Sequence, residues 1–306
     1  MKHVRILGIA IVAVLALAAV AATTASALPE WGKCTAQAGG KYSDSNCTVK
    51  AKKGTGTFEF TKGKSLKNTP FSGSNVGTGG VLTTQLRFCE GPEEQPRETR
   101  KKCAENGGEE QLGGIVSIEC ESEHNTGEAT GSNEVTNVAV KFLGCKLFGS
   151  VPCSNGPEEG EILVKPLKGK LGYIDKAEKK VGLLLEPKTK HGDFANFTCG
   201  SILSTVVGVG NSKEGAFFEP ENKGGNDQII SPITPVNTMT SSYEQVYTVN
   251  PSTYENIPSK FEGKPISLLE SYTFNNEEPG LTTQWMASGE EITNVNTQSE
   301  ESEIKA

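Results

Sequence analysis

Histidine is scarce in this chain, and its scarcity excludes a whole class of enzyme chemistry. Of three histidines, only His124 and His191 lie beyond the apolar N-terminal run. Hydrolysis by a Ser-His-Asp triad needs a histidine as its base, and no G-x-S-x-G nucleophile elbow is present. Both histidines have charged, turn-like neighbours, so we predict that both are surface residues in loops and that no histidine-based triad exists.

Metal-binding and nucleotide-binding patterns are also missing. The cysteines show neither the C-x2-4-C spacing of zinc sites nor a C-x-x-C redox pair, and no calcium-loop pattern occurs. The glycine-rich stretches at residues 77–80 and 208–215 lack the spacing of a phosphate-binding loop. We therefore predict no metal ion and no cofactor. The formal net charge of −7 argues against a nucleic-acid partner and against an anionic membrane surface.

The N-terminal 27 residues have the layout of a secretory signal peptide. Lys2 and Arg5 precede a short apolar run, and Ala25-Ser26-Ala27 forms an A-x-A cleavage site. The run is short for a membrane span, which needs about 20 residues, so an uncleaved anchor is the weaker alternative. We expect a secreted, extracellular protein with no integral membrane segment after cleavage, in solution or associated with the cell surface.

Export changes how the cysteines are interpreted. The chain has eight, and an even number in an exported chain predicts disulfides rather than metal ligands. Proximity along the chain suggests Cys34–Cys47, Cys89–Cys103 and Cys145–Cys153, which leaves Cys120–Cys199 as a long-range bridge. Eight cysteines allow 105 connectivities, so these pairings are hypotheses.

Aromatic residues make up only 7% of the chain, with two tryptophans. Trp31, next to Cys34, is expected to pack over the first disulfide; the alternative is an exposed platform that stacks on a sugar. Trp285, in a polar late segment, is a second candidate for such stacking.

Long helical periodicity is absent, whereas 35 glycines and 15 prolines mark many turns. Short alternating stretches such as TFEFTK, IVSIE and VAVKFL predict strands. We predict an all-β fold: a disulfide-stapled β-sandwich or partly open β-barrel with long loops. The predicted organisation is a hairpin region with a charged Cys89–Cys103 loop (28–112), a main β domain (113–210), a C-terminal extension or small second sheet (211–296), and a disordered tail (297–306).

Several stretches together resemble one protein family. The series WGKC, GGIVSIEC, VTNVAVKFLGC, PLKGKLGYID, FANFTC and PITPVNTMT is similar to a large, highly multiplied family of secreted β proteins from thermoleophilic soil actinobacteria. No activity is assigned to that family. The resemblance therefore implies export and a β fold, and it brings no catalytic residue to this chain.

The sequence favours a non-enzymatic extracellular or cell-surface module for binding or structural display. A cell-wall glycan or an extracellular protein is the candidate partner. The alternative is a secreted, glycosidase-like hydrolase that uses two carboxylates, because such enzymes need only two acids at the right separation. Many acids fall in runs such as Glu158-Glu159, Glu277-Glu278 and Glu290-Glu291, which we expect to be solvated in loops.

Overall fold

The computed structural model describes residues 28–63, 69–90, 109–189, 193–200, 205–210, 228–266, 269–275 and 284–306. The predicted signal peptide, residues 1–27, lies outside these ranges. The described residues contain no α-helix, and the prediction of an all-β fold is confirmed.

Eight strands close into an antiparallel barrel, in which each strand pairs with the next and the last pairs with the first. In order around the barrel they are β3 (Thr69–Asn75), β6 (Ser122–Ala129), β7 (Glu134–Leu143), β11 (Leu167–Asp175), β12 (Lys180–Pro187), β15 (Ile229–Thr234), β16 (Thr240–Val249) and β21 (Gln284–Lys305). Full closure leaves the barrel without an unpaired edge strand.

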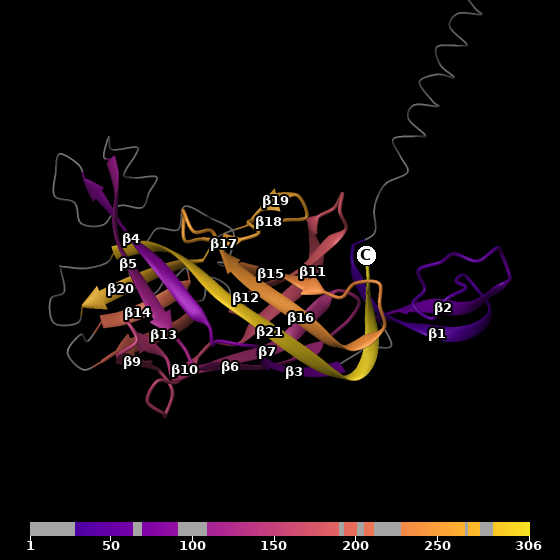
Figure 1. The fold of residues 1–306 in the computed structure, drawn as a ribbon, viewed down its shortest axis with the longest axis horizontal. Helices are drawn as coiled ribbons and strands as arrows, with labels where there is room; N and C mark the ends of the chain where they lie inside the picture. Colours follow the sequence, from indigo (N-terminus) through magenta and orange to yellow (C-terminus); the bar gives the residue numbers. More distant parts are fainter. Residues whose placement is uncertain are drawn as a thin grey trace, which may run out of the picture.

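A second closed circuit of strand pairings adjoins the barrel and shares β21 with it. Its other strands are β4 (Val81–Glu90), β5 (Glu109–Glu119), β8 (Lys146–Leu147), β9 (Val151–Ser154), β13 (Asp193–Cys199), β14 (Thr205–Gly210) and β20 (Glu270–Asn275). Strand β21 is 22 residues long. Its first part pairs with β4 and β20 and its later part with β3 and β16. Figure 1 shows β21, in yellow, running from one group of strands into the other.

A hairpin and four very short strands complete the fold. They are β1 (Glu30–Gly40), β2 (Gly56–Lys62), β10 (Ile162–Leu163), β17 (Asn256–Ile257), β18 (Lys260–Phe261) and β19 (Lys264–Pro265). The β1–β2 hairpin projects from one end of the molecule (Figure 1), and Trp31 of β1 pairs with Ile304 of β21.

The core side chains alternate along the strands, and a small second cluster lies outside the barrel. Val181, Leu183 and Leu185 of β12 belong to the main core, as side chains two residues apart on a strand share a face. Leu184 points the other way and packs with Ile230 and Phe261 in a small second cluster. Strand β12 is therefore covered on both faces, which explains its nearly continuous apolar sequence.

The predicted disordered tail, residues 297–306, is wrong. These residues continue β21, pair with β16 and β1, and include Ile304 at 0% exposure. Strands β3, β6 and β16 come from the predicted segments 28–112, 113–210 and 211–296 and meet in one barrel, so segment 211–296 extends the same sheet, as one of its two predicted alternatives has it, and is not a small second sheet.

Three disulfides join described cysteines. Cys34–Cys47 is as predicted. The predicted Cys145–Cys153 and Cys120–Cys199 pairs are wrong: the structure has Cys120–Cys145 and Cys153–Cys199. Cys145 and Cys153 do lie opposite each other at the base of the β8–β9 hairpin, with Cys153 N donating to Cys145 O at 2.9 Å.

Strand register explains the observed pairing. Cys153 and Cys199 are direct partners on β9 and β13, and the β5–β8 pairing brings Cys120 to Cys145. Each bridge therefore ties neighbouring strands of the second circuit rather than closing its own hairpin. The predicted Cys89–Cys103 bridge cannot be compared, since Cys103 lies outside the described residues. Three disulfides indicate folding in an oxidising environment.

Candidate binding cavity

A cavity of about 110 Å³ lies inside the strand system, and its wall is mostly apolar. Both circuits contribute to it: Phe71, Val140 and Leu183 come from barrel strands, whereas Leu82, Phe194 and Phe197 come from strands of the second circuit. For scale, an apolar cavity of about 150 Å³ in another protein stays dry and binds benzene. The space therefore suits one small molecule.

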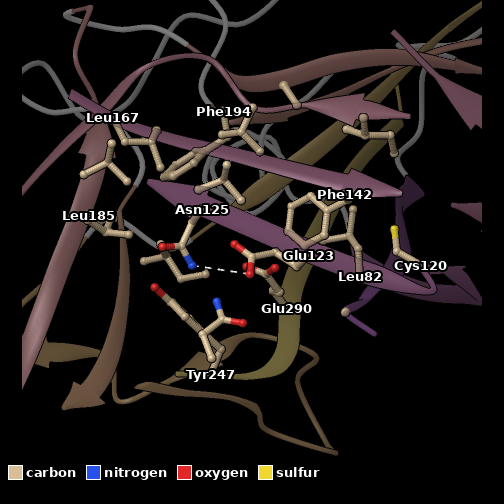
Figure 2. Close-up of a pocket in the computed structure, with 18 of the residues that line it drawn as sticks. Leu82, Cys120, Glu123, Asn125, Phe142, Leu167, Leu185, Phe194, Tyr247 and Glu290 are labelled. Atoms are coloured by element: carbon tan, nitrogen blue, oxygen red, sulfur yellow. Dashed lines mark hydrogen bonds between the residues drawn. The ribbon is translucent and has the colours of Figure 1, made fainter. Parts of the chain in front are cut away.

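One part of the wall is polar, and it is built by the same alternation that builds the core. Glu123 and Asn125 point inward from β6, Gln245 and Tyr247 from β16, and Glu290 and Asn294 from β21. Figure 2 shows the carboxyl groups of Glu123 and Glu290 pointing toward one another, with Tyr247 and Asn125 nearby.

Hydrogen bonds link part of this polar wall into a network. Asn125 Nδ2 donates to Glu123 Oε2 at 3.4 Å (Figure 2). Asn296 Nδ2 donates to Gln245 Oε1 at 2.6 Å, and Gln245 Nε2 donates to Ser231 Oγ at 2.9 Å. These bonds fix the orientation of the Asn125 and Gln245 amides.

The atoms that have no partner in this wall are all acceptors. Of the residues that line the cavity, Glu123 Oε1, Asn125 Oδ1 and Asn294 Oδ1 are buried and have no hydrogen-bond partner among the described residues, and the same holds for Oδ1 of the adjoining Asn296. The three cavity-lining side chains are 0%, 7% and 6% exposed. Buried acceptors without donors destabilise the fold. A ligand that donates hydrogen bonds to these atoms would therefore be favoured in the cavity.

Both cavity carboxyl groups are held toward the neutral form. Burial raises the pKa of Glu123 to about 8; the Asn125 hydrogen bond lowers it, and the neighbouring Glu290 raises it further. Burial also raises the pKa of Glu290 to about 7. Burial likewise raises the pKa of the Tyr247 hydroxyl. Among the described residues of the cavity wall there is no Lys, Arg or His, so none of them offsets these shifts with a positive charge.

Gly73 makes room for the amides of this wall. It lies on β3 between Asn125 of β6 and Asn296 of β21, and it is the register partner of both. A Cβ at this position would come within 2.2 Å of Asn296 Oδ1 and 2.9 Å of Asn125 Nδ2. The missing side chain therefore lets polar groups from non-adjacent strands meet over β3.

The predicted stacking tryptophans do not build this site. Trp31 is 3% exposed and packs edge-to-face against Tyr243, with ring centroids 5.1 Å apart, so its alternative role as an exposed platform is wrong. Trp285 pairs through its backbone with Tyr272 of β20, and its side chain lies outside the description. His124 is a surface residue, as predicted, but it lies on strand β6 rather than in a loop. His191 lies outside the described residues.

The sequence interpretation missed the two acids of the cavity. Glu290, expected to be solvated in a loop, lies on β21 and lines the cavity. Glu123 was passed over within a stretch assigned to turns, although it lies on β6. The available signal was the alternation of Glu123, Asn125, Gly127 and Ala129, which share the buried face of β6.

Other kinds of site are not indicated in the described part of the chain. It holds no group of three or more His, Cys, Asp or Glu side chains placed to bind a metal ion. It also contains no helix with the length and apolarity to cross a membrane. No family model, curated protein or solved structure matches the chain.

Proposed function

We propose that this protein is an exported, non-enzymatic binding protein that holds a small, mainly apolar molecule inside its strand system. The observation that carries the proposal is the apolar cavity whose polar wall offers buried acceptors without donors. The disulfides, the signal-peptide layout and the resemblance to a secreted actinobacterial family support an extracellular location. The sequence favoured a module for binding or structural display, with a cell-wall glycan or an extracellular protein as partner. The proposal here is binding of a small molecule at an interior site.

The cavity itself has an energetic cost that a ligand would offset. At about 24 cal/mol per Å³ of cavity, a space of about 110 Å³ destabilises the empty protein by about 2–3 kcal/mol. A well-packed barrel would fill this space with larger side chains. Small residues such as Ala195 and Gly80 instead line it, which leaves room for a ligand.

Filling the cavity tests the proposal. Benzyl alcohol, a small apolar probe with one hydroxyl donor, should raise the melting temperature of the wild-type protein and give a saturable heat signal in calorimetry. Ala195→Phe should abolish both effects, because Ala195 is buried at 4% exposure in the cavity wall. The matched control Val76→Phe, at a residue 57% exposed, should bind normally. Absence of binding to the wild type, or equal binding to Ala195→Phe, would rule the proposal out.

A second candidate function is hydrolysis by the Glu123–Glu290 pair. The facing carboxyl groups favour it (Figure 2), since many glycosidases act through two acids. The size of the cavity and the raised pKa of both acids weigh against it, because one acid must be ionised and sugar must extend on both sides. Turnover of nitrophenyl glycosides by the wild type, lost in Glu123→Gln and kept in Glu134→Gln, would favour this candidate over the first.

A further inference from the structure

The polar wall of the cavity constrains the chemistry of what it binds. Asn125 Oδ1 and Asn294 Oδ1 accept hydrogen bonds and cannot donate them, and Glu123 Oε1 is purely an acceptor once its carboxyl is ionised; none of the three atoms has a partner among the described residues. They come from β6 and β21, which lie on either side of β3. A ligand that satisfies all three must bring several donors to the polar part of the wall.

Charge points to the same kind of ligand. Two carboxyl groups face this space, whereas the described residues of the wall include no cationic side chain. The nearby His124 and Lys141 do not neutralise these carboxyl groups. His124 is exposed, and its register partner Lys141 forms an ion pair with Glu161 at 3.6 Å. The titratable groups in the wall are Glu123, Glu290 and Tyr247, since Cys120 is disulfide-bonded. The missing partner is thus a cation.

We infer that the ligand is a small protonated amine with an apolar body, whose ammonium group binds Glu123, Asn125 and Asn294 while its apolar part lies against the aromatic and aliphatic wall. An ammonium has three N–H donors and one positive charge, which matches three acceptors beside a carboxyl pair. This inference rests on the proposed function and specifies its ligand class.

Binding should release a proton. In the empty protein Glu123, with a pKa raised to about 8, holds its proton at pH 7. When the ammonium arrives, the Glu123 carboxyl ionises, its proton leaves to solvent, and a charge-assisted hydrogen bond forms between carboxylate and ammonium. The amine keeps its own proton throughout, so up to one proton is released for each amine bound.

Benzylamine and benzyl alcohol form a matched test because they share a ring and differ in the donor group. Calorimetry at pH 7 on the full purified protein should show benzylamine binding at least about tenfold tighter than the alcohol. Its heat should depend on the ionisation enthalpy of the buffer, as proton release requires. Glu123→Gln should bring the two affinities together by weakening benzylamine far more than benzyl alcohol, and Glu134→Gln, at an exposed residue of β7, should behave as wild type.

The outcomes separate the two proposals. Equal binding of amine and alcohol by the wild type would overturn the amine inference and leave the binding function standing. Binding of neither probe would overturn both. If Glu123→Gln fails to fold, as judged by its melting curve, Glu290→Gln replaces it and should also reduce the preference for benzylamine; an unchanged preference there, or in a folded Glu123→Gln, would overturn the inference.

Discussion

Two buried glutamates at different places in the molecule differ in whether a cationic side chain accompanies them. Glu123 in the cavity and Glu303 near the end of β21 are both 0% exposed. Glu303 Oε1 lies 3.1 Å from Lys305 Nζ, whereas the Glu123 carboxyl faces the neutral amide of Asn125 and a second acid, Glu290. Each has one oxygen without a hydrogen-bond partner among the described residues. The presence of an ammonium group is therefore what separates them.

The surroundings of Glu303 form what we term the C-terminal seam: Glu303, Lys305, Tyr42, Asn46 and Cys47. Lys305 Nζ also donates to the carbonyl oxygens of Cys47 and Asn46, and it lies 5.0 Å from the centre of the Tyr42 ring. The ammonium thereby joins the last strand to the disulfide-closed loop of the β1–β2 hairpin. Burial raises the pKa of Glu303, and Lys305 opposes that shift. In the seam the protein supplies its own cation; in the cavity it does not.

This contrast separates structural from recognition acids. A buried carboxyl with an internal cation contributes to the fold, but removing one partner leaves an uncompensated charge. A buried carboxyl without one, beside a cavity, is a candidate for binding an external group. Three substitutions test the contrast, from the largest expected effect to the smallest.

Lys305→Met should have the largest effect on stability. It leaves Glu303 buried without its ammonium, and loss of one partner of a buried pair costs about 3–5 kcal/mol. Urea unfolding at pH 7 measures this cost. The double variant Glu303→Gln with Lys305→Met removes both charges and should recover part of the loss. If the double variant is as unstable as the single one, the ion pair is not what stabilises the seam.

Glu123→Gln should change the pH dependence of stability more than stability itself. The folded protein keeps the Glu123 proton up to a pKa of about 8, whereas an unfolded chain loses it near pH 4.3. The folded state thus binds more protons between these values, and wild-type stability must fall as pH rises through them. The variant should lose about 3–4 kcal/mol less between pH 5 and pH 8, as measured by urea unfolding at both values. Parallel curves for both proteins would contradict this assignment.

Tyr243→Phe should have the smallest effect and tests whether the β21 strand next to the seam depends on specific polar contacts. The buried Tyr243 hydroxyl donates to Ser302 O at 2.8 Å and lies 2.9 Å from Ser302 Oγ. Its loss should cost about 1 kcal/mol in urea unfolding. The half-buried Tyr254 gives the control Tyr254→Phe, which should be neutral. An equal effect of the two would mean that Tyr243 contributes through packing alone.

Sequence patterns predicted the strands whose buried face is apolar. Thr57–Lys62 and Val138–Leu143 carry that signal, and both belong to strands of the structure. The same rule failed for β6 and for the end of β21, where Asn125, Asn296 and Gln298 face the interior. An inward amide looks like an exposed one in sequence, so these strands were assigned to turns and to a disordered tail.

The cavity and two of the disulfides could not be predicted for a different reason. The cavity joins Glu123 to Glu290 through strand order, and the Cys120–Cys145 and Cys153–Cys199 bridges follow strand register. Neither order nor register is set by local pattern alone when many short strands compete. Spacing along the chain therefore identified Cys34–Cys47, within one hairpin region, and misassigned the bridges between strands.

The sharing of β21 has a consequence for how the chain reaches its folded state. Strand β21 (Gln284–Lys305) supplies one strand to the barrel and one to the second circuit. Neither ring of strand pairings can therefore close while β21 is missing. Until β21 pairs, the strands that precede it in the chain cannot complete either ring of pairings. A chain cut short before residue 284 would then forfeit both halves at once, rather than losing one and keeping the other.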